Sequence, residues 1–220
     1  MAEHYGVVPK KFTKAWWGYF WYYYKWHTIG IAALIAAVVF TIIQVNTRPE
    51  YDLTVTYAGH QVFSDEQTAA LCADWGGMIA DTDGNGESAV ELTQLNYADM
   101  IGNEQYDTAM DSKLDLSLYD ETSFIYIADE KRLMRMMNTS YRADVYSETT
   151  DWAADVDDDR LYLVEGKPYA VSLRDSAYFN ERGYKTEDMY MVLRKNYEEK
   201  DSAVIGAYAE SLKLAEYLVK

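Results

Sequence analysis

One short acidic segment of this sequence has the residue types and spacing of a cation site. Asp81, Asp83 and Asn85 place side-chain oxygen atoms at every second position. Oxygen ligands at this spacing can converge on a hard cation such as Ca²⁺, and the backbone carbonyl of Glu87 would add another. The candidate metal ligands are therefore Asp81, Asp83, Asn85 and Glu87; no cofactor is expected, and calcium is the alternative.

The spacing resembles an EF-hand calcium loop, with Gly86 at the position of the sharp turn. The resemblance fails at the twelfth position, where Leu92 replaces the bidentate glutamate and Glu91 comes one residue early. The alternative is a Gly-Asn-Gly turn between a helix and a strand, with acidic side chains that are only solvated.

A second acidic cluster lies further along the chain. Its members are Asp151, Asp155, Asp157, Asp158 and Asp159. A run of charge is usually a solvated loop, and a second cation site is the less favoured alternative.

Motifs for catalysis are lacking. The sequence has no Gly-x-Ser-x-Gly elbow and no Gly-x-x-x-x-Gly-Lys-Ser/Thr phosphate loop. His60 is the one histidine outside the N-terminal region, so a hydrolytic triad would depend on it. Cys72 is the only cysteine, which excludes an internal disulfide and a cysteine-based zinc site. We expect a protein that is not an enzyme.

Charge is distributed unevenly over the 220 residues. Residues 1–48 have five basic residues and one acidic residue, a net charge of +4. Because the whole chain has a net charge of −16, the remaining residues have a net charge of −20. So acidic a region repels nucleic acid, and nucleic-acid partners are therefore not expected. Cationic partners and divalent metal ions are favoured instead.

An uncharged run of eighteen residues, Thr28–Val45, predicts a transmembrane helix. As a helix it spans about 27 Å, close to the hydrocarbon thickness of a bilayer. No small-x-small pattern follows the run, which favours an uncleaved signal-anchor over a cleaved signal peptide.

Aromatic residues occupy nine of the eleven positions before this run, from Trp16 to Trp26. Trp and Tyr favour the headgroup region, where the ring is half buried and its polar end stays hydrated. The predicted membrane-interface residues are Trp16, Trp17, Trp21, Tyr22, Tyr23, Tyr24, Lys25 and Trp26. Four lysines lie on this side of the run and only Arg48 lies directly after it, so the N-terminus is expected in the cytoplasm.

Hydrophobic periodicity beyond residue 50 alternates between strands and helices. Strands are predicted at 52–57, 90–97, 124–128, 160–164, 169–173 and 189–193. The strands at 160–164 and 169–173 are expected to form a hairpin around the turn Glu165-Gly166-Lys167-Pro168. Helices are predicted from a capping box at Ser64–Gln67, at 103–113, after an Asp129 cap, and from residue 201 onward. The uninterrupted apolar strand 124–128 indicates a central position, covered on both faces. This order favours an α/β layer fold with a mixed sheet.

Two stretches carry a resemblance to known proteins. The sequence FWYYYKWHTIG, residues 20–30, resembles the N-terminus of uncharacterised single-pass membrane proteins of Gram-positive bacteria. The succession DLTVTYAG, a helix, VELTQL and FIYIAD, within residues 50–130, resembles one lobe of extracellular solute-binding proteins. In an open α/β fold, ligands bind beyond the carboxyl ends of the parallel strands, which predicts ligand contacts at Gly59, His60 and Asp129. The alternative for His60 is a solvated loop residue.

These inferences give three regions. Residues 1–27 are the cytoplasmic tail and aromatic interfacial segment, 28–45 the transmembrane helix, and 50–220 an acidic extracytoplasmic α/β domain. The expected function is a non-catalytic binding or accessory module at the cell membrane, in contact with the bilayer and with a solute, a peptide or a protein complex. The alternatives are a calcium-dependent surface enzyme and a structural scaffold of a membrane complex.

Overall fold

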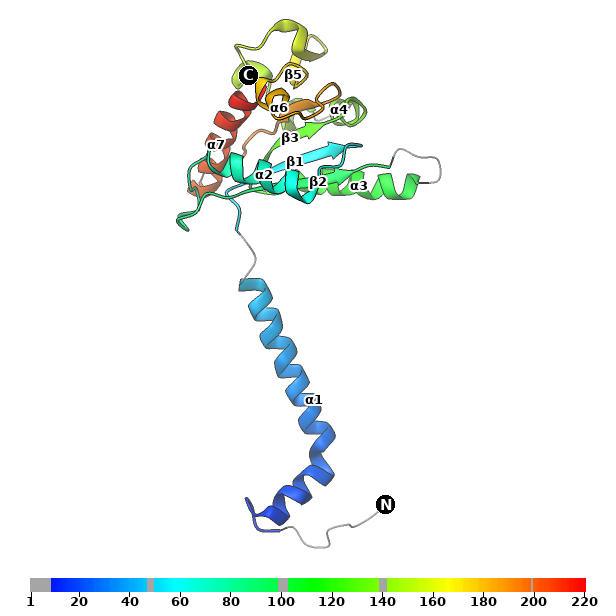
Figure 1. Cartoon of the computed structure of the whole chain (residues 1–220), viewed down its shortest axis with the longest axis vertical. Coiled ribbons are helices and arrows are strands. Elements are labelled where there is room, and N and C mark those ends of the chain that lie inside the picture. The colour runs from blue at the N-terminus through cyan, green and yellow to red at the C-terminus, as the bar shows by residue number, and fades with distance from the viewer. Residues whose placement is uncertain (1–8, 47–49, 99–102, 139–141, 199) are drawn as a thin grey trace. The chain divides into compact units, whose positions relative to one another are not determined.

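The structure is a computed structural model that describes residues 9–46, 50–98, 103–138, 142–198 and 200–220. The chain divides into two compact units, Met1–Pro49 and Glu50–Lys220 (Figure 1). We call the second unit the body. The sequence Arg48-Pro49-Glu50 predicts a short break after the helix, and its first two residues lie outside the described residues.

Helix α1, Lys14–Asn46, contains both the aromatic segment and the uncharged run. Its part Lys14–Ile43 is long and apolar enough to cross a bilayer, and the most apolar stretch of it has no residue buried inside the chain. A signal sequence near an N-terminus meets the same criteria. The hydroxyls of Thr28 and Thr41 donate to the carbonyls four residues earlier, at 3.0 and 2.9 Å, so the helix itself satisfies them.

The aromatic rings of α1 contact one another along the helix. The ring centroids of Trp16 and Phe20 lie 5.4 Å apart, as expected for side chains four residues apart. The Lys25 ammonium lies 5.7 Å from the centre of the Trp26 ring. Six of the eight predicted interface residues are rings at least 41% exposed: Trp17, Trp21, Tyr22, Tyr23, Tyr24 and Trp26. The boundary predicted at residue 27 is not marked by a break in the helix.

The body contains a six-stranded mixed sheet in the order β2-β1-β3-β6-β5-β4. The strands are β1 Leu53–Gly59, β2 Val90–Asn96, β3 Ser123–Ala128, β4 Leu161–Val164, β5 Lys167–Ser172 and β6 Tyr190–Leu193. Strands β2, β1 and β3 are parallel, whereas β6 is antiparallel to both β3 and β5, and β5 is antiparallel to β4. The body is therefore of mixed α/β class, as predicted.

Seven α-helices are described in the whole chain, six of them in the body. The body helices are α2 Asp65–Gly76, α3 Glu104–Ser117, α4 Glu130–Met137, α5 Arg142–Val145, α6 Ala177–Glu181 and α7 Ser202–Val219. Two 3₁₀ turns, Thr149–Asp151 and Asp158–Arg160, precede β4.

Two buried apolar clusters form on alternate residues of the central strands. One cluster takes Val55 and Tyr57 from β1 and packs them with residues of α2, α6 and α7. The other takes Ala58 from β1 and Tyr126 from β3, together with residues of α3 and α4. Alternation of side chains across a strand explains this division. Every residue of β3 is buried, which confirms its predicted central position.

Most predicted elements are confirmed within one or two residues. Ser64 caps α2 with the predicted capping box: its hydroxyl accepts from the Gln67 N–H at 3.2 Å, and its own N–H donates to Gln67 Oε1 at 3.0 Å. Helix α3 extends four residues beyond the predicted end because Leu114 is buried on the same face as Met110. The short helices α5 and α6 were not predicted.

The hairpin between β4 and β5 has a shorter turn than predicted. Glu165 and Gly166 alone form it, both with positive φ (55° and 81°), and Lys167 and Pro168 belong to β5. Two successive residues with positive φ are typical of a two-residue hairpin turn whose twist matches that of the strands.

The capping box of α2 gives a first prediction. Ser64→Ala removes the hydroxyl that accepts from the Gln67 N–H, so this N–H of the first turn loses its side-chain partner, and the variant is expected to lower stability by about 1 kcal/mol. For a body of this size, the melting temperature should fall by roughly 2–4 °C, measured by circular dichroism on the full chain in neutral detergent. Ser202→Ala, in the exposed first turn of α7, is the matched control; an equal shift in both variants would contradict the role of the box.

Candidate functional site

Asp52, directly before β1, organises the predicted calcium segment. It is only 1% exposed, and its Oδ1 accepts from the N–H of Thr82 (2.6 Å), the hydroxyl of Thr82 (2.8 Å) and the N–H of Asp83 (3.3 Å). Its Oδ2 accepts from the N–H of Ala89 at 2.9 Å. Burial alone would raise the pKa of Asp52, but these hydrogen bonds outweigh it and the pKa is lowered. Asp52 is therefore a buried carboxylate that joins the segment to the first strand.

Asp81 shapes the turn of the segment. Its two carboxylate oxygens accept from the N–H groups of Gly84 (2.6 Å) and Gly86 (2.8 Å). Both glycines have positive φ, 80° and 92°, a conformation that residues with a Cβ rarely adopt. The hydrogen bonds from Gly86 and Gly84 lower the pKa of Asp81. The turn therefore holds this carboxylate in its charged form.

Asp83 and Asn85 complete the local hydrogen bonding. Asp83 accepts from the N–H of Asn85 at 2.8 Å and from its side-chain amide at 2.9 Å. Asn85 Oδ1 accepts from the Glu87 N–H at 2.8 Å. The segment thus has the predicted Gly-Asn-Gly turn, and its acidic residues bond the backbone as well as facing solvent.

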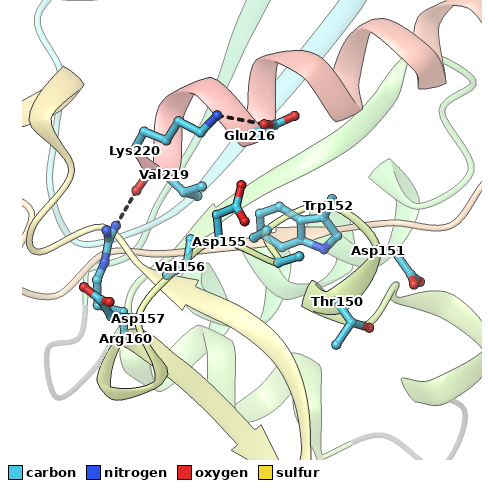
Figure 2. A pocket seen from close by; sticks show the side chains of 12 residues that line it. Thr150, Asp151, Trp152, Asp155, Val156, Asp157, Arg160, Glu216, Val219 and Lys220 are labelled. Atoms are coloured by element: carbon cyan, nitrogen blue, oxygen red, sulfur yellow. Dashed lines mark hydrogen bonds and ion pairs between the residues drawn. The ribbon is translucent and has the colours of Figure 1, made fainter.

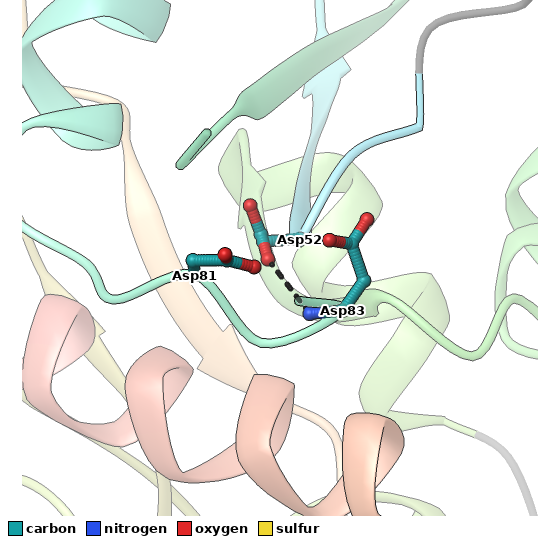
Figure 3. A group of neighbouring side chains, drawn as sticks. All are labelled: Asp52, Asp81 and Asp83. Atoms are coloured by element: carbon teal, nitrogen blue, oxygen red, sulfur yellow. Dashed lines mark hydrogen bonds between the residues drawn. The ribbon is translucent and has the colours of Figure 1, made fainter. Parts of the chain in front are cut away.

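Three carboxylates of this region converge. One oxygen each from Asp52, Asp81 and Asp83 lies within 4.8 Å of the others (Figure 3). This donor set suits a hard divalent cation, although calcium takes six to eight oxygens and other ligands would have to supply the rest. The Glu87 carboxylate is not part of the group. Asp52 was not among the predicted ligands, because nothing in the sequence places it beside a turn 30 residues away.

The end of the motif departs from a calcium loop for a packing reason. Leu92 belongs to the apolar cluster that includes Leu71 and Trp75, so the twelfth position faces the core. Glu91 is its neighbour in β2 and therefore points to the opposite face of the sheet.

The predicted ligand residues Gly59, His60 and Asp129 do come together. Gly59 ends β1, His60 follows it, and Asp129 follows the adjacent parallel strand β3, so all three lie at the edge of the sheet that the carboxyl ends of both strands share. Helix α2 leads from β1 to β2, and α3 returns past β1 to β3 on the opposite face. This reversal is the position where open α/β sheets tend to bind ligands.

The side chains at this edge are already engaged with one another. His60 Nδ1 lies 3.3 Å from Asp129 Oδ2, and Asp129 is 2% exposed. Asp129 caps α4 as predicted, accepting from the N–H of Arg132 at 2.9 Å and from its guanidinium at 3.3 Å. The guanidinium in turn stacks over the Tyr97 ring at 3.8 Å. Asp129 thus braces the start of α4, and its ligand role stays a prediction.

Gly59 is required by a close approach at the same edge. A Cβ at this position would lie 2.4 Å from Tyr57 Oη and 3.3 Å from Asp129 Oδ2. Tyr57 Oη accepts from the Gln61 N–H at 3.0 Å. Burial, helped by the charge of Asp129, raises the pKa of Tyr57 to about 12, although the hydrogen bond from Gln61 lowers it. This hydroxyl therefore stays protonated at neutral pH.

The second acidic cluster divides between a cavity and the surface. Asp151, Asp155 and Asp157 line a cavity of about 410 Å³ beside the buried Trp152. Figure 2 shows that two basic side chains of this cavity are already bonded: Arg160 donates to the Val219 carbonyl at 2.6 Å, and Lys220 pairs with Glu216 at 2.7 Å.

The other two members lie elsewhere. Asp158 does not line this cavity, and Asp159 pairs with Arg174 at 3.6 Å. Among the residues that the structure describes, the acidic groups converge to within 4.8 Å only around Asp52. The five acidic residues of this cluster are therefore divided between the cavity and the rest of the surface.

Cys72 is half-buried, and burial raises its pKa. A raised pKa lowers the thiolate fraction at neutral pH, as is typical of a cysteine that packs against apolar neighbours.

Comparisons with family models, with curated proteins and with solved structures found no match to this chain.

Asp52 gives the prediction for this region. Asp52→Asn replaces one acceptor oxygen by a donor that faces backbone N–H groups, and it should lower the free energy of unfolding by about 1–3 kcal/mol. Because the folded pKa of Asp52 is lowered, its stabilisation is present above the ordinary value of 3.8 and is lost as pH falls through the folded value. The difference between wild type and variant should therefore be large at pH 7 and shrink below pH 4.

Melting curves of the full chain from pH 7 to pH 3 measure this dependence. Glu187→Gln, at an exposed acid of the body, is the control and should change the melting temperature little at either pH. A deficit in Asp52→Asn that stays constant as pH falls would show that the charge of Asp52 is not what stabilises the fold.

Proposed function

We propose that this protein is a membrane-anchored, non-catalytic binding or accessory module whose acidic body lies outside the cytoplasm. The observation that carries the proposal is α1: an apolar helix of spanning length with none of its most apolar stretch covered by the rest of the chain.

Exposed apolar surface on α1 is the first support. Leu34 and Phe40 are 65% and 67% exposed, and each apolar side chain of this size gains about 1.5–3 kcal/mol when it leaves water. A bilayer supplies that environment, and the helix satisfies its own backbone hydrogen bonds there. A core helix of a soluble domain would instead be covered by its own chain.

The aromatic segment is the second support. Its exposed Trp and Tyr rings suit a headgroup region, in which their polar ends remain hydrated. Lys10, Lys11, Lys14 and Lys25 lie on the same side of the uncharged run. Positively charged residues that flank a transmembrane helix tend to stay on the cytoplasmic side, which favours a cytoplasmic N-terminus and an external body.

The body supports binding more than catalysis. Its histidine, His60, pairs with the buried carboxylate of Asp129, which caps α4, so the pair stabilises the start of this helix. Helices on both faces of the sheet, at the two apolar clusters, support the expected layered α/β arrangement. The parallel half of the sheet agrees with the proposed resemblance to one lobe of solute-binding proteins.

Cysteine labelling in intact cells tests the topology. In a Cys72→Ala background, Lys11→Cys reports the N-terminal side and Glu187→Cys reports the body; both positions are exposed. We expect a membrane-impermeant maleimide to label Glu187→Cys in intact cells and Lys11→Cys only after lysis. The protein should also stay with the membrane during alkaline carbonate extraction.

The opposite labelling pattern would place the body in the cytoplasm, and release by carbonate would show that α1 does not span the bilayer. Either result overturns the proposed location. The background variant without an added cysteine controls for labelling of other proteins.

Convergence of Asp52, Asp81 and Asp83 favours one alternative, a calcium-dependent function at the surface. This alternative predicts that millimolar calcium raises the melting temperature of the full chain, since a ligand at a hundred times its Kd adds about 2.7 kcal/mol to stability. Asp83→Ala should abolish the rise, because it removes one of the three carboxylates.

Magnesium at equal concentration and a chelator serve as controls for ionic strength and for bound metal. The matched variant is Glu187→Gln, which removes an acid away from the group and should keep the full calcium effect. A melting temperature that does not change with calcium, or changes equally in both variants, would count against a specific calcium site.

A further inference from the structure

A second cavity of the body, of about 590 Å³, lies at the edge of the sheet opposite to His60 and Asp129. Its walls come from the end of α3, the segment after β6 and the start of α7; Tyr119, Glu121, Arg194, Tyr197, Glu198 and Val204 are among its lining residues. Its volume is in the range of ligand-binding pockets. No sequence motif pointed to this position, because its walls are separated by more than 70 residues.

Two tyrosines give the cavity its aromatic character. Tyr119 is 84% exposed and Tyr197 is 61% exposed, and Leu116, one turn earlier in α3, is also exposed. Aromatic rings with this much free surface are available to a partner. They favour a partner large enough to cover the mouth of the cavity as well as to enter it.

Arg194 fixes one wall of this cavity. The side chain is buried, stacks on Phe124 at 4.5 Å and donates to the carbonyls of Leu118 (2.9 Å) and Asp120 (2.7 Å). These two carbonyls flank Tyr119, so the arginine fixes the segment that presents the ring. A third bond, to the Ser123 carbonyl at 2.8 Å, ties the same guanidinium to β3.

Three carboxylates line the same cavity as the two tyrosines. Glu121 is exposed and forms no hydrogen bond or ion pair with the described residues, and Glu198 accepts two backbone N–H groups through Oε1 alone. Asp115 also lines the cavity but is paired with Arg135 at 2.9 Å. These three carboxylates disfavour an anion in the cavity, and the charge of Arg194 is already directed at carbonyl oxygens.

We propose that this cavity binds a lysine or arginine side chain presented by a partner polypeptide. The tyrosine rings offer cation–π contact and cover the apolar stem, while Glu121 and Glu198 pair with the charged end. The net charge of −20 beyond residue 48 attracts a cationic segment from a distance. This inference deepens the proposed binding function by naming the partner class, and it depends on the body alone.

Binding of a defined cationic peptide to the full chain tests the proposal. The chain is placed in nanodiscs of uncharged lipid, and the probe is a fluorescent ten-residue peptide in which lysine alternates with glycine. Two further peptides replace lysine by N-acetyl-lysine or by glutamate. Empty nanodiscs give the background, and fluorescence anisotropy gives Kd at two salt concentrations.

We expect the lysine peptide to bind and both altered peptides to bind at least about tenfold more weakly, because the acetylated side chain is neutral and the glutamate peptide meets carboxylates. The double variant Tyr119→Ala/Tyr197→Ala should weaken lysine-peptide binding about tenfold, and Glu121→Gln about threefold. Tyr119→Phe should keep the affinity, since the ring face and not the hydroxyl makes the contact.

Matched controls separate this site from the general acidity of the body. Tyr106→Ala removes an exposed tyrosine at the other end of α3, and Glu187→Gln removes an exposed acid elsewhere; both should leave Kd within twofold. Equal effects of site and control variants would overturn the proposal, as would equal binding of the acetylated peptide. Preference for the glutamate peptide would identify an anion site at Arg194 instead.

This experiment and the labelling experiment fail independently. A cationic-peptide site can exist in a body on either side of the membrane, so loss of specific peptide binding rejects the site and leaves the topology in place. A body found in the cytoplasm rejects the proposed location and leaves the peptide result unchanged.

Discussion

Apolar surface that the chain does not cover is the constraint on which the proposed biology of this protein depends. The uncharged run Thr28–Val45 forms part of one long helix, and its residues 29–43 are all exposed. In water, such a surface promotes association or aggregation. Bilayer hydrocarbon removes the apolar surface from water without requiring any contact from the body. The body can therefore be folded around its own core while α1 serves only as an anchor.

Within the body, buried charged groups tie loops to the ends of strands. Asp52 joins the turn at residues 81–87 to the start of β1, and Asp129 fixes the start of α4 at the end of β3. Arg160 and Arg194 do the same with carbonyl groups: Arg160 bonds those of Ser172 and Val219, and Arg194 bonds three around the start of β3. A buried charge is stable only when such partners satisfy it, so each of these residues fixes the position of a neighbouring segment.

The carboxylates of the body divide into those that stabilise the fold and those that are available to a partner. Asp52 and Asp129 have nearly all their acceptor capacity directed at the protein, whereas Glu121 has no partner among the described residues. A net negative charge on the body therefore has two components. One part stabilises turns and helix ends, and the other is free to attract cations, which is the part that a binding site can use.

Local features of the fold were predictable because neighbouring residues produce them. The capping box at Ser64, the cap at Asp129 and the buried strand 124–128 depend on contacts within a few residues or on a simple apolar pattern, and the structure confirms all three. The turn between β4 and β5 was predicted too long, because Pro168 was assigned to the turn. A proline can instead lie near the start of a strand at an irregularity in the pairing, and the register of β4 and β5 shifts at this position.

By itself, the sequence determined an uncharged helix of spanning length, an aromatic segment before it and an acidic α/β body after it. These are properties of composition and periodicity, which do not depend on how distant segments pack. The tertiary structure alone decided which polar groups meet: Asp52 with a turn 30 residues later, His60 with Asp129 across 69 residues, and Arg194 with Leu118 across 76. Strand order brings these pairs together, and strand order follows from the packing of both apolar clusters on the sheet, which no local pattern in the chain specifies.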